Sequence, residues 1–212
     1  MKKDNRKNAF EVYNQVADWF AENRDRGLIE KPYLDQVIAL LNRNARILDL
    51  GCGTGQPILD YLIRQNLNVT GVDASQKILN LARKNFPSTA FIQADMRQLS
   101  LGNKFDAIIA WHSFFHLPAE DQPAMFKIFS NHLQPNGILL FTSGTEHGEA
   151  WGLIGGEKLF HASLSTKEYT QLLTNHNFTL LNHQVNDPNC GNATIWTAKY
   201  TPDKQPKDPK IG

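Results

Sequence analysis

The chain has 212 residues, a length at which one hydrophobic core is efficient, so we expect a single domain. Hydrophobic residues make up 41% of the chain and charged residues 20%, a composition that excludes an intrinsically disordered protein. With 22 basic and 21 acidic side chains the net charge is +1, which gives no long-range attraction for a polyanion or a membrane surface.

Export and membrane insertion are not expected. The two cysteines, Cys52 and Cys190, are too few for a disulfide framework. The charged start MKKDNRKNAF is followed by no apolar stretch, and no window approaches the roughly 18 apolar residues of a membrane span. We therefore expect a cytoplasmic protein.

The first part of the chain predicts two helices that precede any strand. One helix is predicted by apolar residues at three- and four-residue spacings, namely Phe10, Tyr13, Val16, Ala17, Phe20 and Ala21. A second is expected from about Pro32, which suits a first helical turn, through Leu41. We expect residues 1–43 to form an N-terminal helical cover.

Short apolar runs alternate with helix-length segments from Arg46 onward. The runs are apolar at consecutive positions, which predicts strands buried on both faces of a parallel sheet, at 46–50, 68–73, 90–95, 105–111 and 137–143. Helices are expected at 56–65, 75–85 and 120–133, the second with Ser75 as its cap. This βαβ alternation predicts an α/β core over residues 44–200.

The end of the chain follows a different pattern. The predicted strands 178–185 and 193–200 are separated by only seven residues, too few for a crossover helix, so they should pair antiparallel. Residues 201–212 are rich in Pro and Lys and are expected to form a loose tail.

The strongest local signal is the run ILDLGCGTG, in which an apolar strand leads directly into Gly51, Gly53 and Gly55. Glycines let the backbone turn sharply and approach a ligand, and the following helix start offers free N–H groups. A tight turn without a ligand is the alternative. Asp73 ends the next strand, where its carboxylate can accept hydrogen bonds from both hydroxyls of a ribose or can cap the next helix.

Asp95 and Met96 follow the third strand. A carboxylate there can accept from an adenine amino group, and the Met96 side chain can pack on the ring face. Alone, Asp95 is typical of a turn. Its order after the glycine loop and Asp73, each at the end of a successive strand, favours a nucleoside-containing cofactor.

These motifs resemble those of the class I S-adenosylmethionine-dependent methyltransferases, specifically the small soluble members. The resemblance runs from about Tyr13 to Tyr200 and rests on LDLGCGTG, GVDAS, ADM, FDAIIAWHSFFHL and LQPNGILLFT in that order. It implies a Rossmann-like, seven-stranded, mostly parallel sheet with the last strand antiparallel and helices on both faces. It implies S-adenosylmethionine as cofactor, with its methionine part on the glycine loop, its ribose on Asp73 and its adenine on Asp95 and Met96.

The cofactor-binding set expected from this resemblance is Asp49, Gly51, Cys52, Gly53, Gly55, Asp73, Ala74, Asp95, Met96 and Trp111. A nicotinamide or flavin oxidoreductase is the main rival class. Its dinucleotide usually requires G-x-G-x-x-G, whereas the glycines here fall as G-x-G-x-G with Gln56 in the sixth position. A non-catalytic S-adenosylmethionine-binding protein is a further alternative.

The acceptor is expected to be a small molecule. Methyltransferases that act on amino groups of nucleic-acid bases typically place an Asn or Asp, two prolines and an aromatic residue after the fourth strand, and the segment WHSFFHL departs from this. Nucleic acid is not expected as a partner, although methylation of a protein or RNA side group stays an alternative. The expected substrate pocket consists of Tyr13, Phe20, Phe115 and Trp151.

The histidines of this segment are the candidate catalytic residues, and no metal site is expected. His116 is the first candidate general base and His112 the second, because an imidazole accepts a proton near neutral pH. Each could instead cap a helix or fill the core, and His147 and His161 are further candidates. The glycine-rich segment 144–160 is expected to form either a lid over the pocket or an irregular surface connection.

Overall fold

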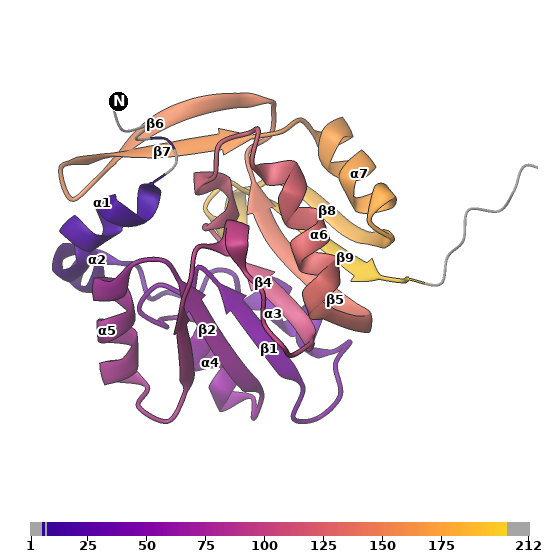
Figure 1. The fold of residues 1–212 in the computed structure, drawn as a ribbon, viewed down its shortest axis with the longest axis horizontal. Coiled ribbons are helices and arrows are strands. Elements are labelled where there is room, and N and C mark those ends of the chain that lie inside the picture. Colours follow the sequence, from indigo (N-terminus) through magenta and orange to yellow (C-terminus); the bar gives the residue numbers. More distant parts are fainter. Residues whose placement is uncertain (1–5, 7, 203–212) are drawn as a thin grey trace, which may run out of the picture.

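A seven-stranded sheet forms the centre of the molecule (Figure 1). The computed structural model describes residues 6 and 8–202. The strands lie in the order β3-β2-β1-β4-β5-β9-β8, with bounds β1 Arg46–Leu50, β2 Asn68–Asp73, β3 Ala90–Gln93, β4 Phe105–Ala110, β5 Leu133–Ser143, β8 Phe178–Asp187 and β9 Ala193–Tyr200. Strands β1 to β5 pair in parallel, and β9 pairs antiparallel with both β5 and β8. The predicted sheet is confirmed.

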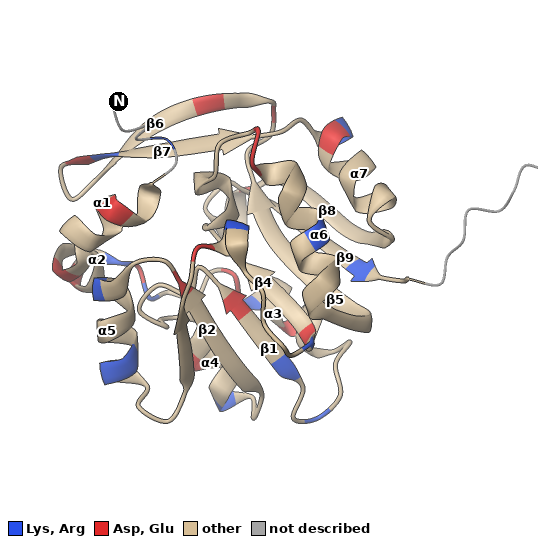
Figure 2. Cartoon of the chain, viewed as in Figure 1, with Lys and Arg blue, Asp and Glu red and all other residues tan. Residues whose placement is uncertain are grey.

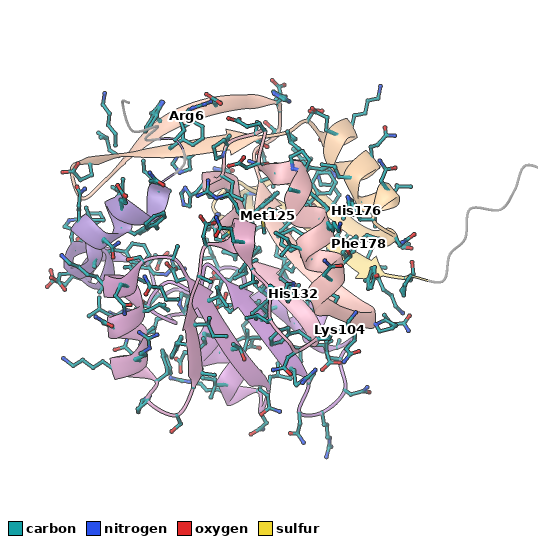
Figure 3. The ribbon with its side chains drawn as sticks, viewed as in Figure 1. Arg6, Lys104, Met125, His132, His176 and Phe178 are labelled. Atoms are coloured by element: carbon teal, nitrogen blue, oxygen red, sulfur yellow. The ribbon has the colours of Figure 1, made fainter. Side chains whose placement is uncertain are left out.

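Helices cover both faces of this sheet, as predicted. One face carries α3 Lys31–Ile38, α4 Ile58–Arg64 and α5 Gln76–Asn85, and the other carries α6 Gln122–His132 and α7 Thr166–Asn175. Successive strand residues alternate between the two cores, so that Ile47 packs with the first group of helices and Leu48 with the second. Met125 and Phe178, labelled in Figure 3, belong to the second core.

Two helix starts have side-chain caps that explain their position. Ser75 accepts a hydrogen bond from the Ile78 amide at 3.3 Å, which confirms it as the cap of α5. Helix α7 was not predicted. It begins with a capping box in which Ser165 accepts from the Glu168 amide and the Glu168 carboxylate accepts from the Ser165 amide.

The N-terminal segment forms two helices where one was predicted. Helices α1 Ala9–Gln15 and α2 Ala17–Asn23 are separated at Val16, whose backbone leaves the helical region at φ −100° and ψ 14°. Val16 is buried, with its side chain next to Gly155 of a distant turn, so tertiary packing and not apolar periodicity determines this break. Most of the predicted tail, residues 203–212, lies outside the described residues.

The glycine-rich segment after β5 forms a β-hairpin and not an irregular connection. Strands β6 Gly148–Ile154 and β7 Glu157–Ser163 pair antiparallel and lie across α1 (Figure 1). Gly155 and Gly156 join them with φ values of +55° and +87°, the positive values that a two-residue hairpin turn requires.

None of the helices within residues 6 and 8–202 has the length and apolar character of a membrane span.

Candidate active site

A cavity of about 110 Å³, partly open to solvent, lies at the carboxyl ends of β1 to β4 under α1 and α2. Ligands of open α/β folds bind at this edge of the sheet because the loops that follow parallel strands meet there. Figure 2 shows acidic segments at the ends of β1 and β2, which carry Asp49 and Asp73. The cavity therefore combines backbone loops, carboxylates and aromatic side chains.

Most of the predicted site residues line this one cavity. From the cofactor-binding set it is lined by Gly51, Cys52, Gly53, Asp73, Ala74, Asp95, Met96 and Trp111, and from the acceptor side by Tyr13, Phe20, His112 and His116. Four predicted residues do not line it. Asp49 is buried behind the loop, Gly55 faces Phe86 and Leu59, Phe115 packs on neighbouring histidine rings, and Trp151 lies half exposed on β6.

The glycine loop is held to the end of β2 by Asp73. The Gly53 amide donates to Asp73 Oδ2 at 3.0 Å, and the Ser75 amide donates to Asp73 Oδ1 at 2.8 Å. Each carboxylate oxygen has two lone pairs, so each keeps one for a ligand. Burial raises the pKa of Asp73, and the backbone hydrogen bonds partly offset that rise. The geometry suits a pair of adjacent hydroxyl donors.

Gly51 and Gly53 are required for different reasons. Both have positive φ, +80° and +56°. A Cβ at Gly51 would lie 2.2 Å from Ser113 Cβ, so a larger residue there would collide with the β4 loop. At Gly53 the nearest atom to such a Cβ is Phe20 Cε1 at 3.6 Å, so a side chain would project into the cavity space.

Asp95 lies on the cavity wall but already has a partner. Its two carboxylate oxygens accept from Arg97, with the shortest distance, 2.6 Å, between Arg97 Nη2 and Asp95 Oδ2. Arg97 also bridges to Asp121 at 3.1 Å. Burial alone would raise the pKa of Asp95, but the hydrogen bonds and charge of Arg97 outweigh it and lower that pKa. An adenine amino group would share this carboxylate with Arg97, so its predicted role stays a prediction.

The acceptor side contains a chain of three groups from three separate elements. The Tyr13 hydroxyl lies 3.0 Å from His116 Nε2, and His116 Nδ1 lies 3.0 Å from the Phe160 carbonyl oxygen. His116 is 9% exposed, and its burial lowers its pKa to about 3. The imidazole is therefore neutral at ordinary pH.

The other histidines differ in their access to the cavity. His112 lines the wall with an exposed side chain and a φ of +46°, unusual outside glycine, and its amide donates to Thr142 Oγ1 at 2.9 Å. Although His112 reaches solvent, the surrounding cavity wall still desolvates its imidazole and, with the charges of Arg24 and His161, lowers its pKa to about 4. His161 packs against His116 with ring centres 4.9 Å apart, and His147 pairs with Glu168 at the surface, 3.0 Å away. Among the described residues, no cluster of His, Cys, Asp and Glu is suited to hold a metal ion.

Part of the chain is similar to a known protein family. Residues 47–137, from β1 into β5, match the family described as methyltransferase domain. Over this part of the sheet the chain is similar to the S-adenosylmethionine-dependent methyltransferases. A putative methyltransferase of Bacillus subtilis is 37% identical over 132 residues, which cover 58% of this chain and 53% of the relative.

A second relative is the dTDP-3-amino-3,4,6-trideoxy-alpha-D-glucopyranose N,N-dimethyltransferase of Streptomyces venezuelae. It is 32% identical over 96 residues, 44% of this chain and 40% of the relative. The chain spans about half the length of the curated relatives it matches.

Solved methyltransferase structures share the fold. An S-adenosylmethionine-dependent methyltransferase from Clostridium acetobutylicum superposes with a TM-score of 0.69 at 18% identity, covering 90% of this chain and 99% of that one. The amino pentose methyltransferase CalS10 from Micromonospora echinaspora, solved with S-adenosylmethionine bound, gives 0.68 at 19% identity, covering 90% and 97%. At these identities the likeness establishes the fold alone.

The residues of this cavity fit S-adenosylmethionine, the cofactor bound in the solved neighbour CalS10. Because Gly53 has no Cβ, the space beside the loop is free for a ligand to occupy. Asp73 keeps lone pairs for ribose hydroxyls, and Met96 and Trp111 give the wall apolar surface. These features come from loops after β1, β2, β3 and β4, which supports one continuous binding site.

Two cavity and cover residues, Arg24 and Asn14, were not predicted from the sequence. Arg24, just after α2, lines the cavity, donates through Nε to the Gln56 carbonyl at 2.7 Å, and lies over the Phe20 ring. Asn14 Oδ1 accepts from Ser75 Oγ at 2.8 Å and from the Lys77 amide at 3.1 Å, which ties α1 to the start of α5. Polar residues on an amphipathic helix carry no sequence signal for such contacts.

We expect Asp49 to make the stability of this protein depend on pH. Burial raises its pKa to about 7, above the roughly 3.9 of an unfolded aspartate, so the folded state binds the proton more tightly. This contribution is complete below about pH 4 and is lost as pH rises to about 7. Asp49→Asn should therefore remove that loss, with a relative gain in unfolding free energy between pH 4 and 8 on the order of 4 kcal/mol at most.

Urea unfolding at pH 4.5 and 8 measures this effect. The matched control is Asp18→Asn, because Asp18 is exposed on α2 and its substitution changes the charge equally. A variant with the same pH dependence as the parent would show that Asp49 is ionised throughout.

Proposed function

We propose that this chain transfers the methyl group of S-adenosylmethionine to a small-molecule acceptor. The observation that carries the proposal is the shared cavity: the glycine loop and Asp73 line the same space as Tyr13, Phe20 and His112. Helices α1 and α2 cover that space, which favours an acceptor small enough to be enclosed. A polymer side chain would require an open groove instead.

The proposed cofactor contacts follow from the geometry of the loops. Gly51, Gly53 and Cys52 hold the methionine part, and Asp73 accepts from the ribose hydroxyls. Asp95 and Met96 face the adenine, and Ala74 and Trp111 complete the wall. Arg24 brings a positive charge into the cavity, where it suits the carboxylate of a bound amino acid. Asp49 supports the loop from behind.

When bound, S-adenosylmethionine supplies an electrophilic methyl group on a sulfonium. The protein's part is to align the acceptor atom with that methyl and to exclude water, and both can supply much of the rate. His112 is the exposed imidazole of the cavity and is our candidate base where an acceptor must lose a proton. His116, buried and neutral, acts through its fixed hydrogen bonds.

Relatives support a small acceptor. The Streptomyces relative is by its name a dimethyltransferase of an amino sugar nucleotide, and CalS10 is an amino pentose methyltransferase. Other relatives are ubiquinone/menaquinone biosynthesis C-methyltransferases from Campylobacter jejuni, 28% identical over 165 residues. These names cover nitrogen and carbon acceptors, and all are small molecules.

Two measurements test the proposal. Calorimetry should detect S-adenosylhomocysteine binding in the micromolar range, and radioactive methyl from S-adenosylmethionine should pass to some members of a panel of small amines, phenols and quinols. Binding without transfer to any acceptor would favour a non-catalytic binding protein, and transfer only to protein or RNA would overturn the small-molecule assignment. Loss of nicotinamide absorbance with no response to S-adenosylhomocysteine would indicate an oxidoreductase.

A further inference from the structure

The hydrogen-bond chain Tyr13–His116–Phe160 has a defined direction. The Phe160 carbonyl oxygen can only accept, so His116 Nδ1, 3.0 Å away, must donate to it. A neutral imidazole carries one N–H, so Nε2 has a lone pair. The Tyr13 hydroxyl, 3.0 Å from Nε2, must therefore donate to it.

This direction is stable over the ordinary pH range. Burial lowers the pKa of His116 to about 3. The hydrogen bond to the Phe160 carbonyl opposes this shift, and the nearby His161 and His112 add to it. Burial also raises the pKa of Tyr13, with Asp73 adding to that rise and Arg24 opposing it. The phenol keeps its proton and the imidazole stays neutral.

Tyr13 is held in one orientation at the cavity wall. Its ring meets Phe20 and His116 edge to face, with centroid distances of 5.4 and 5.5 Å. Tyr13 lines the cavity, and its only hydroxyl hydrogen is committed to His116, so any further hydrogen bond to its oxygen must be one that the oxygen accepts. Tyr13 is thus a fixed hydrogen-bond acceptor in the space that the proposed function assigns to the substrate.

We propose that Tyr13 binds the methyl acceptor by accepting a hydrogen bond from it, so that the site selects molecules that present an N–H or O–H group. The inference rests on the proposed function in one respect: the molecule that occupies the cavity beside Tyr13 is taken to be the methyl acceptor. His116 is a positioning residue, because its two ring nitrogens are engaged by the Tyr13 hydroxyl and the Phe160 carbonyl and it thereby fixes the direction of the Tyr13 hydroxyl. A fully methylated nitrogen or oxygen lacks this donor and is bound less tightly.

Matched fluorinated probes test the selection. We would titrate 4-fluorophenol against 4-fluoroanisole, and 4-fluoroaniline against 4-fluoro-N,N-dimethylaniline, by fluorine NMR on protein saturated with S-adenosylhomocysteine. The member with the O–H or N–H should bind about 3- to 10-fold more tightly, the usual worth of one hydrogen bond. Tyr13→Phe should abolish the difference without changing S-adenosylhomocysteine affinity.

The control variant is Tyr61→Phe, which also loses a hydroxyl that bonds to a side chain, Asp35, but lies outside the cavity. It should keep the preference. Nitrogen NMR of His116 provides a spectroscopic readout. Nδ1 should carry the proton in the parent protein. The Nε2 resonance should shift in Tyr13→Phe and should not shift in Tyr61→Phe.

Several results would overturn the inference. These are equal binding of both probe partners, no binding of any probe, a preference that survives Tyr13→Phe, or a His116 protonated on Nε2. Binding of S-adenosylhomocysteine to the parent protein is measured in a separate titration. If the parent does not bind it, the proposed function is rejected, but the direction of the Tyr13 hydrogen bond is still decided by the nitrogen NMR of His116.

Discussion

Asp73→Ala is expected to weaken S-adenosylhomocysteine binding by about 1–3 kcal/mol, or roughly 5- to 150-fold. The substitution removes the proposed acceptor of two ribose hydroxyls and also the partner of the Gly53 amide at 3.0 Å. The same substitution therefore also removes the hydrogen bond that holds the glycine loop to the end of β2. Calorimetric titration with S-adenosylhomocysteine measures the change.

Asp106→Ala is the control for this prediction. Asp106 is also an aspartate of a central strand, and its Oδ2 also accepts from a backbone amide, that of Arg46 at 2.8 Å, but it does not line the cavity. It should bind S-adenosylhomocysteine as the parent does. Parent-like affinity in folded Asp73→Ala protein would remove Asp73 from the ribose site.

Gly53→Val should abolish measurable S-adenosylhomocysteine binding, a loss of more than about 100-fold, because the new side chain projects into the cavity. The backbone φ of +56° adds strain of about 1–2 kcal/mol, which lowers stability in the free and bound protein alike. Circular dichroism should stay close to that of the parent, and calorimetry reports the loss of binding.

Gly156→Val is the control that separates the effect of backbone strain from the effect of a side chain that blocks the cavity. Gly156 has a φ of +87° in the hairpin turn and no atom within 4 Å of an added Cβ, so its substitution adds strain far from the loop. This variant should be less stable and should bind normally. Gly53→Ala, with a smaller side chain, should show an intermediate affinity. Normal binding by Gly53→Val would mean that the ligand does not pass beside this residue.

Some features went unpredicted although the sequence contains a local signal for them. The Gly155–Gly156 pair between alternating residues is typical of a two-residue hairpin turn, and it joins β6 to β7. Ser165 followed three residues later by Glu168 is a capping-box pattern, and it starts α7. Both patterns lie within a few consecutive residues, so they can be recognised in the sequence without knowledge of the fold.

By itself, the sequence determined the sheet, the glycine loop and the order of Asp73 and Asp95 along the sheet edge. These follow from local rules: consecutive apolar residues form doubly buried strands, glycines permit positive φ, and the carboxyl ends of parallel strands meet at one edge. The antiparallel pairing of β8 with β9 follows from the short connection between them.

The arrangement of the acceptor side depends on contacts between segments that are distant in the chain. Tyr13 and His116 are 103 positions apart, and His116 and Phe160 are 44 apart, so packing alone joins them. His116 was expected to titrate near neutral pH, but burial lowers its pKa to about 3. A pKa depends on solvent access and on neighbours from distant segments, and the chain specifies these only once it has folded.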